Sequence, residues 1–253
     1  MTAAPRAHSF NAAAAQYAAS RPSYPSRLLD VLEEITGRGL AGARVADIGA
    51  GTGIAAALLR ERGADVLAVE PGDGMVAQLR GAFPELPAVR GDGNALPLAD
   101  ASHDLLTYAQ SWHWTDTGRS VPEALRVLRP GGALAVWWNT EASDVPWIAA
   151  QQERLAQHCG VPRRTAPPAD DARAAQLAGL AELPVVRRRL RWSRTVPLHT
   201  HLANIGTRSA LLVLDEADAR AFLDGECARL REVFPDEAVE ETYVLDLLVA
   251  TRP

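Results

Sequence analysis

The fold of this chain is decided by one stretch, VADIGAGTG, which spans Val45–Gly53. Its apolar start predicts a buried strand, and three glycines at alternate positions follow at once. Glycine allows positive φ angles and lets a ligand approach the backbone closely. Residues 54–62 favour a helix, whose first N–H groups are available to a ligand. The stretch therefore predicts a strand, a ligand-binding turn and a helix in succession.

Three carboxylates are expected at one edge of the sheet that this stretch begins. Asp47 lies two residues before the first glycine, and Glu70 and Asp92 end the next two predicted strands. Because the carboxyl ends of parallel strands meet at one edge, these side chains line a single crevice. Their negative charge repels a pyrophosphate and attracts the sulfonium and ammonium groups of S-adenosylmethionine. The looser pattern GxGxxA at 51–56 leaves a dinucleotide such as NAD, and hence an oxidoreductase, as the alternative.

The glycine turn and two later blocks resemble the class I S-adenosylmethionine-dependent methyltransferases. The turn matches the acid-x-Gly-x-Gly-x-Gly signature of that family, and the blocks Gly91–Leu98 and Leu128–Gly132 match in order and spacing. The likeness covers roughly residues 9–140. It is strongest to small-molecule enzymes of the trans-aconitate methyltransferase type, which share an opening like Tyr17–Pro25 and a loop like Gln110–Trp114. The resemblance implies an enzyme that transfers a methyl group from S-adenosylmethionine.

Short apolar strands alternate with helices from Arg44 onward, which predicts an α/β fold with a parallel sheet covered on both faces. Strands are expected at 44–48, 65–70, 88–90, 104–110 and 133–139. The sequence Pro130-Gly131-Gly132 is expected to end the helix before the fifth strand. In the C-terminal third, helices are expected at 145–159 and 216–233, and strands at 185–197 and 242–250. The resemblance implies a Rossmann-like sheet of seven strands, mostly parallel, with an antiparallel C-terminal edge.

The expected domain organisation has an N-terminal helical lid and one large domain. The lid takes residues 1–36, and the methyltransferase domain takes residues 37–253. Within that domain, residues from about 145 to 204 are expected to form an insertion that covers the substrate.

The resemblance implies a donor site built from the N-terminal segment, the glycine turn and the strand ends that follow it. Its expected members are Tyr17, Arg21, Asp47, Gly49, Gly51, Gly53, Glu70, Pro71, Met75, Asp92, Gly93, Asn94 and Gln110. Glu70 is expected to accept hydrogen bonds from the ribose hydroxyls, and Asp92 from the adenine amino group. The alternatives are a turn-capping role for Asp92, ordinary core contact for Met75, and a surface position for Arg21 rather than contact with the donor's carboxylate.

The acceptor side is expected at Trp112-His113-Trp114, directly after the fourth predicted strand. His113 is the candidate general base because imidazole titrates near neutral pH, and Tyr24 is the second catalytic candidate and a substrate contact. Alignment of donor and acceptor without a base is the alternative. The two tryptophans are expected to line the substrate cavity, with a place in the core as their alternative, and Arg208 is a further candidate contact for a carboxylate.

Composition and missing motifs narrow the acceptor and the setting. The net charge of −5 and the lack of an Asn/Asp-Pro-Pro-aromatic motif argue against nucleic acid. The acceptor is therefore expected to be a small molecule, either an oxygen acceptor or an electron-rich ring such as an indole, methylated at carbon or nitrogen. A non-catalytic donor-binding protein is a distant alternative. The chain has no lysine, which excludes Schiff-base and Walker-type lysine chemistry.

Other features of the sequence concern localisation and metals. No signal peptide and no run long enough to cross a bilayer are recognised, and the two cysteines are isolated. We therefore expect a cytoplasmic protein with reduced thiols and no membrane partner. The Ala- and Arg-rich, lysine-free composition is typical of a GC-rich bacterial genome, and a role in bacterial secondary metabolism is expected. No cluster of metal-ligating residues stands out, and no metal is expected.

Overall fold

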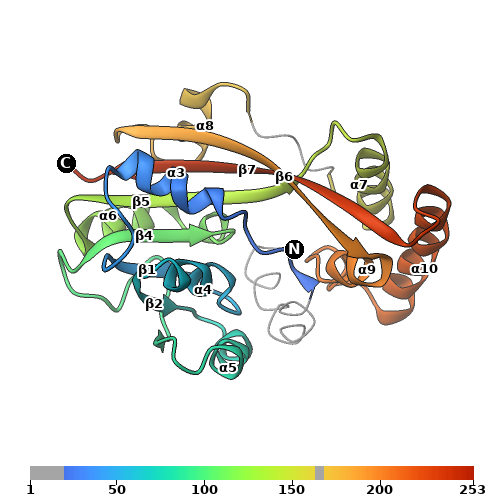
Figure 1. Cartoon of the computed structure of the whole chain (residues 1–253), viewed down its shortest axis with the longest axis horizontal. Coiled ribbons are helices and arrows are strands. Elements are labelled where there is room, and N and C mark those ends of the chain that lie inside the picture. Colours follow the sequence, from blue (N-terminus) through green and yellow to red (C-terminus); the bar gives the residue numbers. More distant parts are fainter. Residues whose placement is uncertain (1–19, 163–167) are drawn as a thin grey trace. The chain divides into compact units, whose positions relative to one another are not determined.

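The computed structural model describes residues 20–162 and 168–253, and within them one sheet of seven strands organises the chain (Figure 1). The strands lie in the order β3-β2-β1-β4-β5-β7-β6. Their bounds are β1 (Arg44–Ile48), β2 (Asp65–Val69), β3 (Ala88–Val89), β4 (His103–Ala109), β5 (Leu128–Glu141), β6 (Val185–Pro197) and β7 (Ala238–Thr251). The order reverses between β1 and β4, which is where ligands bind in open sheets of this kind.

The sheet is parallel except for β7. Strand β1 pairs in parallel with β2 and β4, and β4 pairs in parallel with β5. The N–H of Gly131 donates to the carbonyl of Arg252, whereas the N–H of Ala142 donates to that of Thr242, so β5 and β7 run in opposite directions. The expected sheet, mostly parallel with an antiparallel C-terminal edge, is confirmed.

Helices connect most of the strands. They are α3 (Arg27–Thr36), α4 (Ile54–Glu61), α5 (Asp73–Ala82), the short 3-10 helix η1 (Trp112–Trp114), α6 (Thr117–Val127), α7 (Pro146–His158), α8 (Asp171–Leu177), α9 (Leu198–Gly206) and α10 (Glu216–Val233). The side chain of Asp116 caps α6 by accepting from the N–H of Gly118. By contrast, α4 begins after Gly53 without a side-chain cap, which leaves N–H groups of its first turn available to a ligand. No helix in residues 20–162 and 168–253 combines the length and apolar character that a membrane span requires.

The chain divides into two compact units. The first, here called the sheet unit, comprises Ser23–Asn139, Pro167–Leu190 and Leu245–Pro253. The second, here called the helical unit, comprises the segment up to Pro22 with Thr140–Ala166 and Arg191–Val244, and it contains α7, α9 and α10. Strands β5, β6 and β7 each begin or end in the helical unit.

Pro130-Gly131-Gly132 does not end a helix, so that expectation was wrong. Helix α6 ends at Val127, and all three residues lie within β5. The N–H of Arg252 donates to the carbonyl of Gly132, which continues the pairing with β7. Hydrogen bonds to a strand from the far end of the chain thus decide the conformation here, and a local sequence pattern cannot reveal them. Helices α8 and α9 were not expected either.

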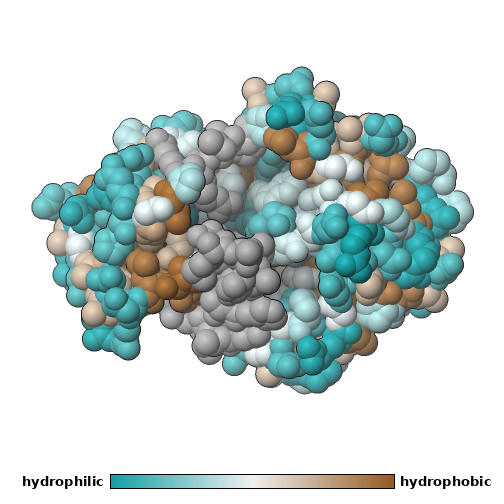
Figure 2. Space-filling view, turned by 180° about the vertical axis from the view of Figure 1, so that it is seen from behind, coloured by the Kyte–Doolittle hydropathy of each residue, from teal (hydrophilic) through white to brown (hydrophobic). Residues whose placement is uncertain are grey.

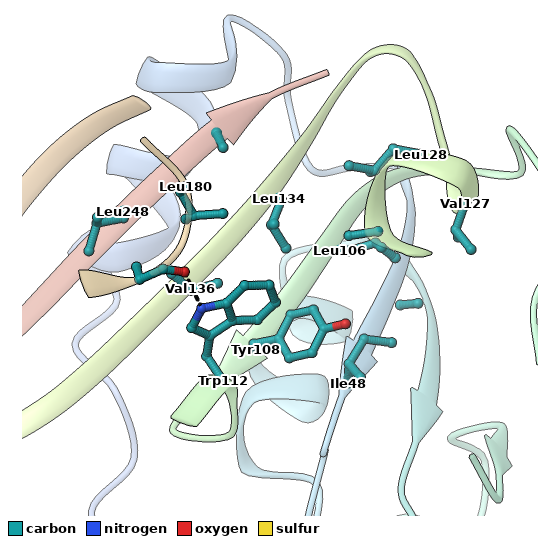
Figure 3. Packing of buried hydrophobic residues seen from close by; sticks show 14 of the residues in the cluster. Ile48, Leu106, Tyr108, Trp112, Val127, Leu128, Leu134, Val136, Leu180 and Leu248 are labelled. Carbon is teal, nitrogen blue, oxygen red and sulfur yellow. Dashed lines mark hydrogen bonds between the residues drawn. The ribbon is translucent and has the colours of Figure 1, made fainter. Parts of the chain in front are cut away.

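Apolar side chains are concentrated inside the molecule. The face drawn in Figure 2 is largely hydrophilic, with smaller apolar patches between the polar regions. Figure 3 shows part of the main apolar cluster of the sheet unit, where residues of β1, β4 and β5 pack with Leu180 and Leu248. Burial of these side chains from water is the main favourable contribution to folding.

A buried ion pair joins β6 to β7 in the sheet unit. Arg187 donates from Nε to Oδ1 of Asp246 at 2.6 Å and from Nη2 to Oδ2 at 2.7 Å. The two side chains are only 2% and 5% exposed. Arg187 also donates from Nη1 to the carbonyl of Pro168 at 2.8 Å, which ties the segment before α8 to the sheet. A charge so deeply buried depends on its partner for stability.

Asp47, at the end of β1, is a fully buried carboxyl group. Its Oδ1 accepts from the hydroxyl of Thr107 on β4 at 2.7 Å. Burial raises the pKa of Asp47 to about 7, although the Thr107 hydroxyl lowers it, and the charge of Glu70 adds to the rise. The folded protein therefore binds a proton at Asp47 in a pH range where the unfolded chain has already released it.

Replacement of Asp246 by Ala is expected to destabilise the protein by about 3 kcal/mol, because it removes both close contacts of the buried Arg187 guanidinium with Asp246 and leaves, as a charged partner among the described residues, only the exposed carboxylate of Asp171, 3.2 Å from Nη1. Asp144→Ala is the matched control, since Asp144 forms an ion pair with Arg191 in which the two side chains are 69% and 51% exposed. The control should cost at most ~1 kcal/mol. Urea unfolding of both variants measures the difference, and equal losses would contradict the role assigned to the buried pair.

The stability of the protein is expected to depend on pH through Asp47. Between the unfolded pKa of about 3.8 and the folded pKa of about 7, the folded state binds more protons, so this group's contribution becomes less favourable as pH rises. Asp47→Asn removes the titration. The free energy of unfolding of the variant, relative to that of wild type, should therefore increase as pH rises from 5 to 8. The increase should be about 1.4 kcal/mol for each pH unit below the folded pKa of about 7. Asp65→Asn, at an exposed carboxylate, should show no such trend.

Candidate functional site

The glycine turn after β1 packs tightly at both ends and is open in the middle. Gly49, Gly51 and Gly53 have φ angles of 66°, 59° and 91°, which favour glycine. A Cβ at Gly49 would lie 2.5 Å from Cβ of Ser111, and one at Gly53 would lie 3.1 Å from Cγ of Leu79. A Cβ at Gly51 would meet no described atom within 4 Å. Packing thus requires glycine at the outer two positions, whereas none of the described residues covers the backbone at Gly51. Contact of the three glycines with the donor stays a prediction.

Glu70 follows β2 and holds the turn in place. Its Oε2 accepts from the N–H of Gly51 at 2.8 Å, and its Oε1 accepts from the N–H of Gly72 at 2.8 Å. The residue is 7% exposed, and burial raises its pKa against the lowering effect of these two backbone donors. Each carboxylate oxygen has a second lone pair, so Glu70 can still accept hydrogen bonds from a vicinal diol.

Two buried oxygen atoms near the turn are not satisfied by the described residues. Oδ2 of Asp47 and Oγ1 of Thr52 make no hydrogen bond of normal geometry within residues 20–162 and 168–253. Buried polar atoms of this kind cost free energy unless a ligand or water supplies a partner. The bare backbone at Gly51 and these oxygens fit a ligand that brings hydrogen-bond donors, such as the ammonium group of S-adenosylmethionine.

The block after β3 forms a closed turn. Oδ1 of Asp92 accepts from the backbone N–H of Asn94 at 2.8 Å and from its side-chain amide at 2.9 Å. Gly93 lies against Tyr108, whose hydroxyl donates to its carbonyl. The turn-capping role left open for Asp92 is therefore present, and contact of these three residues with adenine stays a prediction.

Two other residues expected near the adenine differ in exposure. Met75 is 6% exposed and lies on the buried side of α5, in agreement with its alternative as a core residue. Pro71 is exposed, and its carbonyl accepts from Arg90. Their contact with the donor also stays a prediction.

The residue directly after β4 has an unusual backbone conformation. Gln110 has a φ of 61°, a value that non-glycine residues adopt infrequently. Its side-chain amide donates to the carbonyl of Asn139 at 2.8 Å, and its backbone N–H donates to the carbonyl of Trp137. The ends of β4 and β5 are therefore joined at the edge where the glycine turn lies.

Trp112 lies in the core. It is 2% exposed and packs edge-on against Tyr108 with ring centroids 4.6 Å apart. Its indole N–H donates to the carbonyl of Ala178 at 2.8 Å, the dashed line in Figure 3. Of the two readings left open for Trp112, the structure favours the core residue over the cavity wall.

His113 is exposed beside two tryptophans of the sheet unit. Its ring lies 4.6 Å from that of Trp114, and its Nδ1 accepts from Nε1 of Trp138 at 3.3 Å. Trp138 was not expected from the sequence, and its only signal was its place near the end of the fifth strand. Tyr24 packs edge-on against Trp137 with centroids 5.6 Å apart.

The remaining expected residues belong to the helical unit or lie outside the described residues. Arg21 donates to the carbonyl of Thr207 at 3.1 Å, and Arg208 forms an ion pair with Glu141. Burial, reinforced by the charge of Arg21, lowers the pKa of Arg208 to about 10. Tyr17 and the expected lid up to residue 19 lie outside the described residues. The roles of Tyr17, Arg21 and Arg208 stay predictions.

A second polar cluster lies within the helical unit. Oε1 of Glu241 lies 2.7 Å from Nδ1 of His201, and Oε2 of Glu241 accepts from Arg194 at 2.6 Å and from Tyr243 at 2.8 Å. Although burial favours the protonated carboxyl, His201 and Arg194 lower the pKa of Glu241 to about 2. These groups satisfy one another, so the cluster is a structural network. No group of residues suited to bind a metal is found among the described ones.

Comparison with known proteins agrees with this geometry. Residues 46–136 match the model of the methyltransferase domain family. An uncharacterized methyltransferase of Mycobacterium tuberculosis is 44% identical over 140 residues, which cover 55% of this chain and 56% of that protein. A demethylmenaquinone methyltransferase of Beutenbergia cavernae is 40% identical over 107 residues, covering 42% of this chain and 43% of that protein. The chain thus matches only about half the length of these curated relatives.

A solved structure resembles most of the chain. It is named as a proposed type II methyltransferase from Anaeromyxobacter dehalogenans and matches with a TM-score of 0.67 and 26% sequence identity. The match covers 91% of this chain and 97% of that one. Together with the strand order, the glycine turn and Glu70, these similarities show that the chain carries a class I, S-adenosylmethionine-dependent methyltransferase domain.

Proposed function

We propose that this protein transfers the methyl group of S-adenosylmethionine to a small-molecule acceptor, in bacterial secondary metabolism. The observation that carries the proposal is the pairing of Glu70 with the open backbone at Gly51. When bound, S-adenosylmethionine supplies an electrophilic methyl group. The chain's own part is to bind, orient and shield the reactants.

Different residues of the sheet unit bind different parts of the donor. Glu70 accepts hydrogen bonds from the ribose hydroxyls, while the unsatisfied oxygen of Asp47 faces the ammonium group. Pro71 and the turn Asp92–Asn94 contact the adenine. Gln110, held by its bond to the carbonyl of Asn139, borders the site at the end of β4. These roles use positions that the fold already fixes and require no rearrangement of the sheet.

The acceptor side of the proposal rests on the residues after β4. His113 and Trp114 are the last two residues of η1, and their rings are in contact. Tyr24 is held by its contact with Trp137. An acceptor held here in line with the methyl group needs chiefly alignment, which by itself is worth several orders of magnitude in rate. An oxygen acceptor is the first candidate.

An electron-rich ring, methylated at carbon or nitrogen, is the second candidate. The aromatic rings of Trp114 and Trp138 flank His113 and offer faces on which such a ring stacks. The relative from Beutenbergia cavernae is named for demethylmenaquinone, a quinone whose reduced form is an electron-rich hydroquinone ring, and this supports the second candidate.

A screen with labelled donor tests the proposed function. The protein is incubated with S-adenosylmethionine that carries a labelled methyl group and with pooled small metabolites, and products are identified by mass. Labelled esters or ethers support the oxygen acceptor, and label on ring carbon or nitrogen supports the second candidate. Binding of S-adenosylhomocysteine without any labelled product, across pools that cover both classes, would instead support a non-catalytic donor-binding protein.

Gly51→Ala is expected to weaken the binding of S-adenosylhomocysteine at least ~10-fold, because the new methyl group occupies the space in which the ligand meets the backbone. Gly160→Ala is the matched control. Gly160 has the same φ of 59° and likewise open space at its Cβ, but it follows α7. Calorimetry compares the two variants. Equal affinities would show that Gly51 is not at the donor site.

Glu70→Ala is expected to weaken the binding of S-adenosylhomocysteine by about 1–3 kcal/mol, since the ribose hydroxyls and two backbone N–H groups lose their acceptor. Glu61→Ala, at an exposed carboxylate at the end of α4, is the control and should bind normally. Titration of wild type with NAD separates the two cofactor classes. Tighter binding of NAD than of S-adenosylhomocysteine would reverse the assignment.

A further inference from the structure

The contact between Trp138 and His113 fixes where the imidazole carries its proton. An indole N–H is a donor only, so the nitrogen that faces it must be an acceptor. That nitrogen is Nδ1 of His113, 3.3 Å from Nε1 of Trp138. In the neutral ring the proton therefore lies on Nε2.

The fold holds the two residues together by pairing of adjacent strands. Ala109 at the end of β4 is in register with Trp137 on β5, and the N–H of Gln110 donates to the carbonyl of Trp137. Trp138 is the next residue of β5, and His113 lies in η1, just beyond β4. Trp114 contacts the imidazole ring at a centroid distance of 4.6 Å. The pairing of β4 with β5 thus decides where the indole N–H of Trp138 lies relative to His113.

We propose that Trp138 is a positioning residue that keeps His113 in its Nε2–H form, so that His113 donates a hydrogen bond to the acceptor. This inference rests on the proposed function. A general base needs an unprotonated nitrogen that faces the proton to be removed. In this form Nε2 carries a proton and Nδ1 is occupied by Trp138. His113 would have to give up the Trp138 bond before it could act as the base expected from the sequence.

The tautomer also points to the chemical class of the acceptor. A donor at Nε2 suits an acceptor oxygen that already carries negative charge and has no proton to lose. In that reaction a C–O bond forms as the C–S bond breaks, the electron pair of the C–S bond stays on sulfur, and no proton moves. The role of His113 is then to hold the anionic group in line with the methyl carbon.

Nuclear magnetic resonance tests the tautomer without any turnover. Long-range ¹H–¹⁵N spectra of the labelled full chain at pH 8, where a neutral imidazole predominates, distinguish the two neutral forms by their cross-peak patterns. His113→Gln identifies the signals by their loss. We expect the Nε2–H pattern in wild type, a shift toward the other form in Trp138→Phe, and no shift in Trp114→Phe, which keeps the indole donor of Trp138. An Nδ1–H pattern in wild type, or no response to Trp138→Phe, would overturn the proposal.

Kinetics with an acceptor from the screen test the role of the donor. Glutamine at position 113 offers an amide N–H but cannot act as a base. His113→Ala should lower kcat by ~10²-fold, the size of effect that misalignment of an acceptor can have, whereas His113→Gln should stay within about 10-fold of wild type. Equal losses in both variants would show that His113 acts as a base. If the screen yields no acceptor, the proposed function fails, but the spectra still decide the tautomer.

Discussion

The carboxylate of Glu70 is the interaction on which the rest of the site depends. It accepts one backbone hydrogen bond from the glycine turn after β1 and another from Gly72, just before α5. Because the group is buried, both bonds form in a low-dielectric environment, where losing either is costly. The same two bonds fix the backbone at Gly51 and leave each carboxylate oxygen one further lone pair. The conformation of the turn, and the donor binding proposed for it, therefore depend on one side chain.

Packing imposes the spacing of the glycines around that carboxylate. Gly49 lets the turn approach Ser111, whose hydroxyl donates to the carbonyl of Ile48 at 2.5 Å, so the ends of β1 and β4 lie close together. Gly53 lets the start of α4 pack against Leu79 of α5. At Gly51, by contrast, a Cβ would meet no described atom within 4 Å, so packing among the described residues does not account for this glycine. Glycine thus occupies the three positions for different physical reasons, although the three form one sequence signature.

The end of β4 and the neighbouring part of β5 bring the aromatic residues and His113 together. Gln110 takes a positive φ there, and hydrogen bonds to Trp137 and Asn139 hold it. A non-glycine residue persists in this conformation only where its surroundings enforce it. The result is a fixed edge on which Trp138 donates to His113, and the alignment of an acceptor proposed above depends on it.

The sequence by itself determined the strand, glycine turn and helix, the succession of strands along the first half of the chain, and the position of Glu70 directly after the second strand, because each depends on residues close together in the chain. The bounds of β1, β6 and α10 follow from local apolar patterns in the same way. Only the tertiary structure decided that Pro130-Gly131-Gly132 is extended, that Trp112 lies in the core, and that Trp138 donates to His113. These features depend on which strand lies beside which and in what register. Partners far apart in the chain set that register, and no local pattern encodes it.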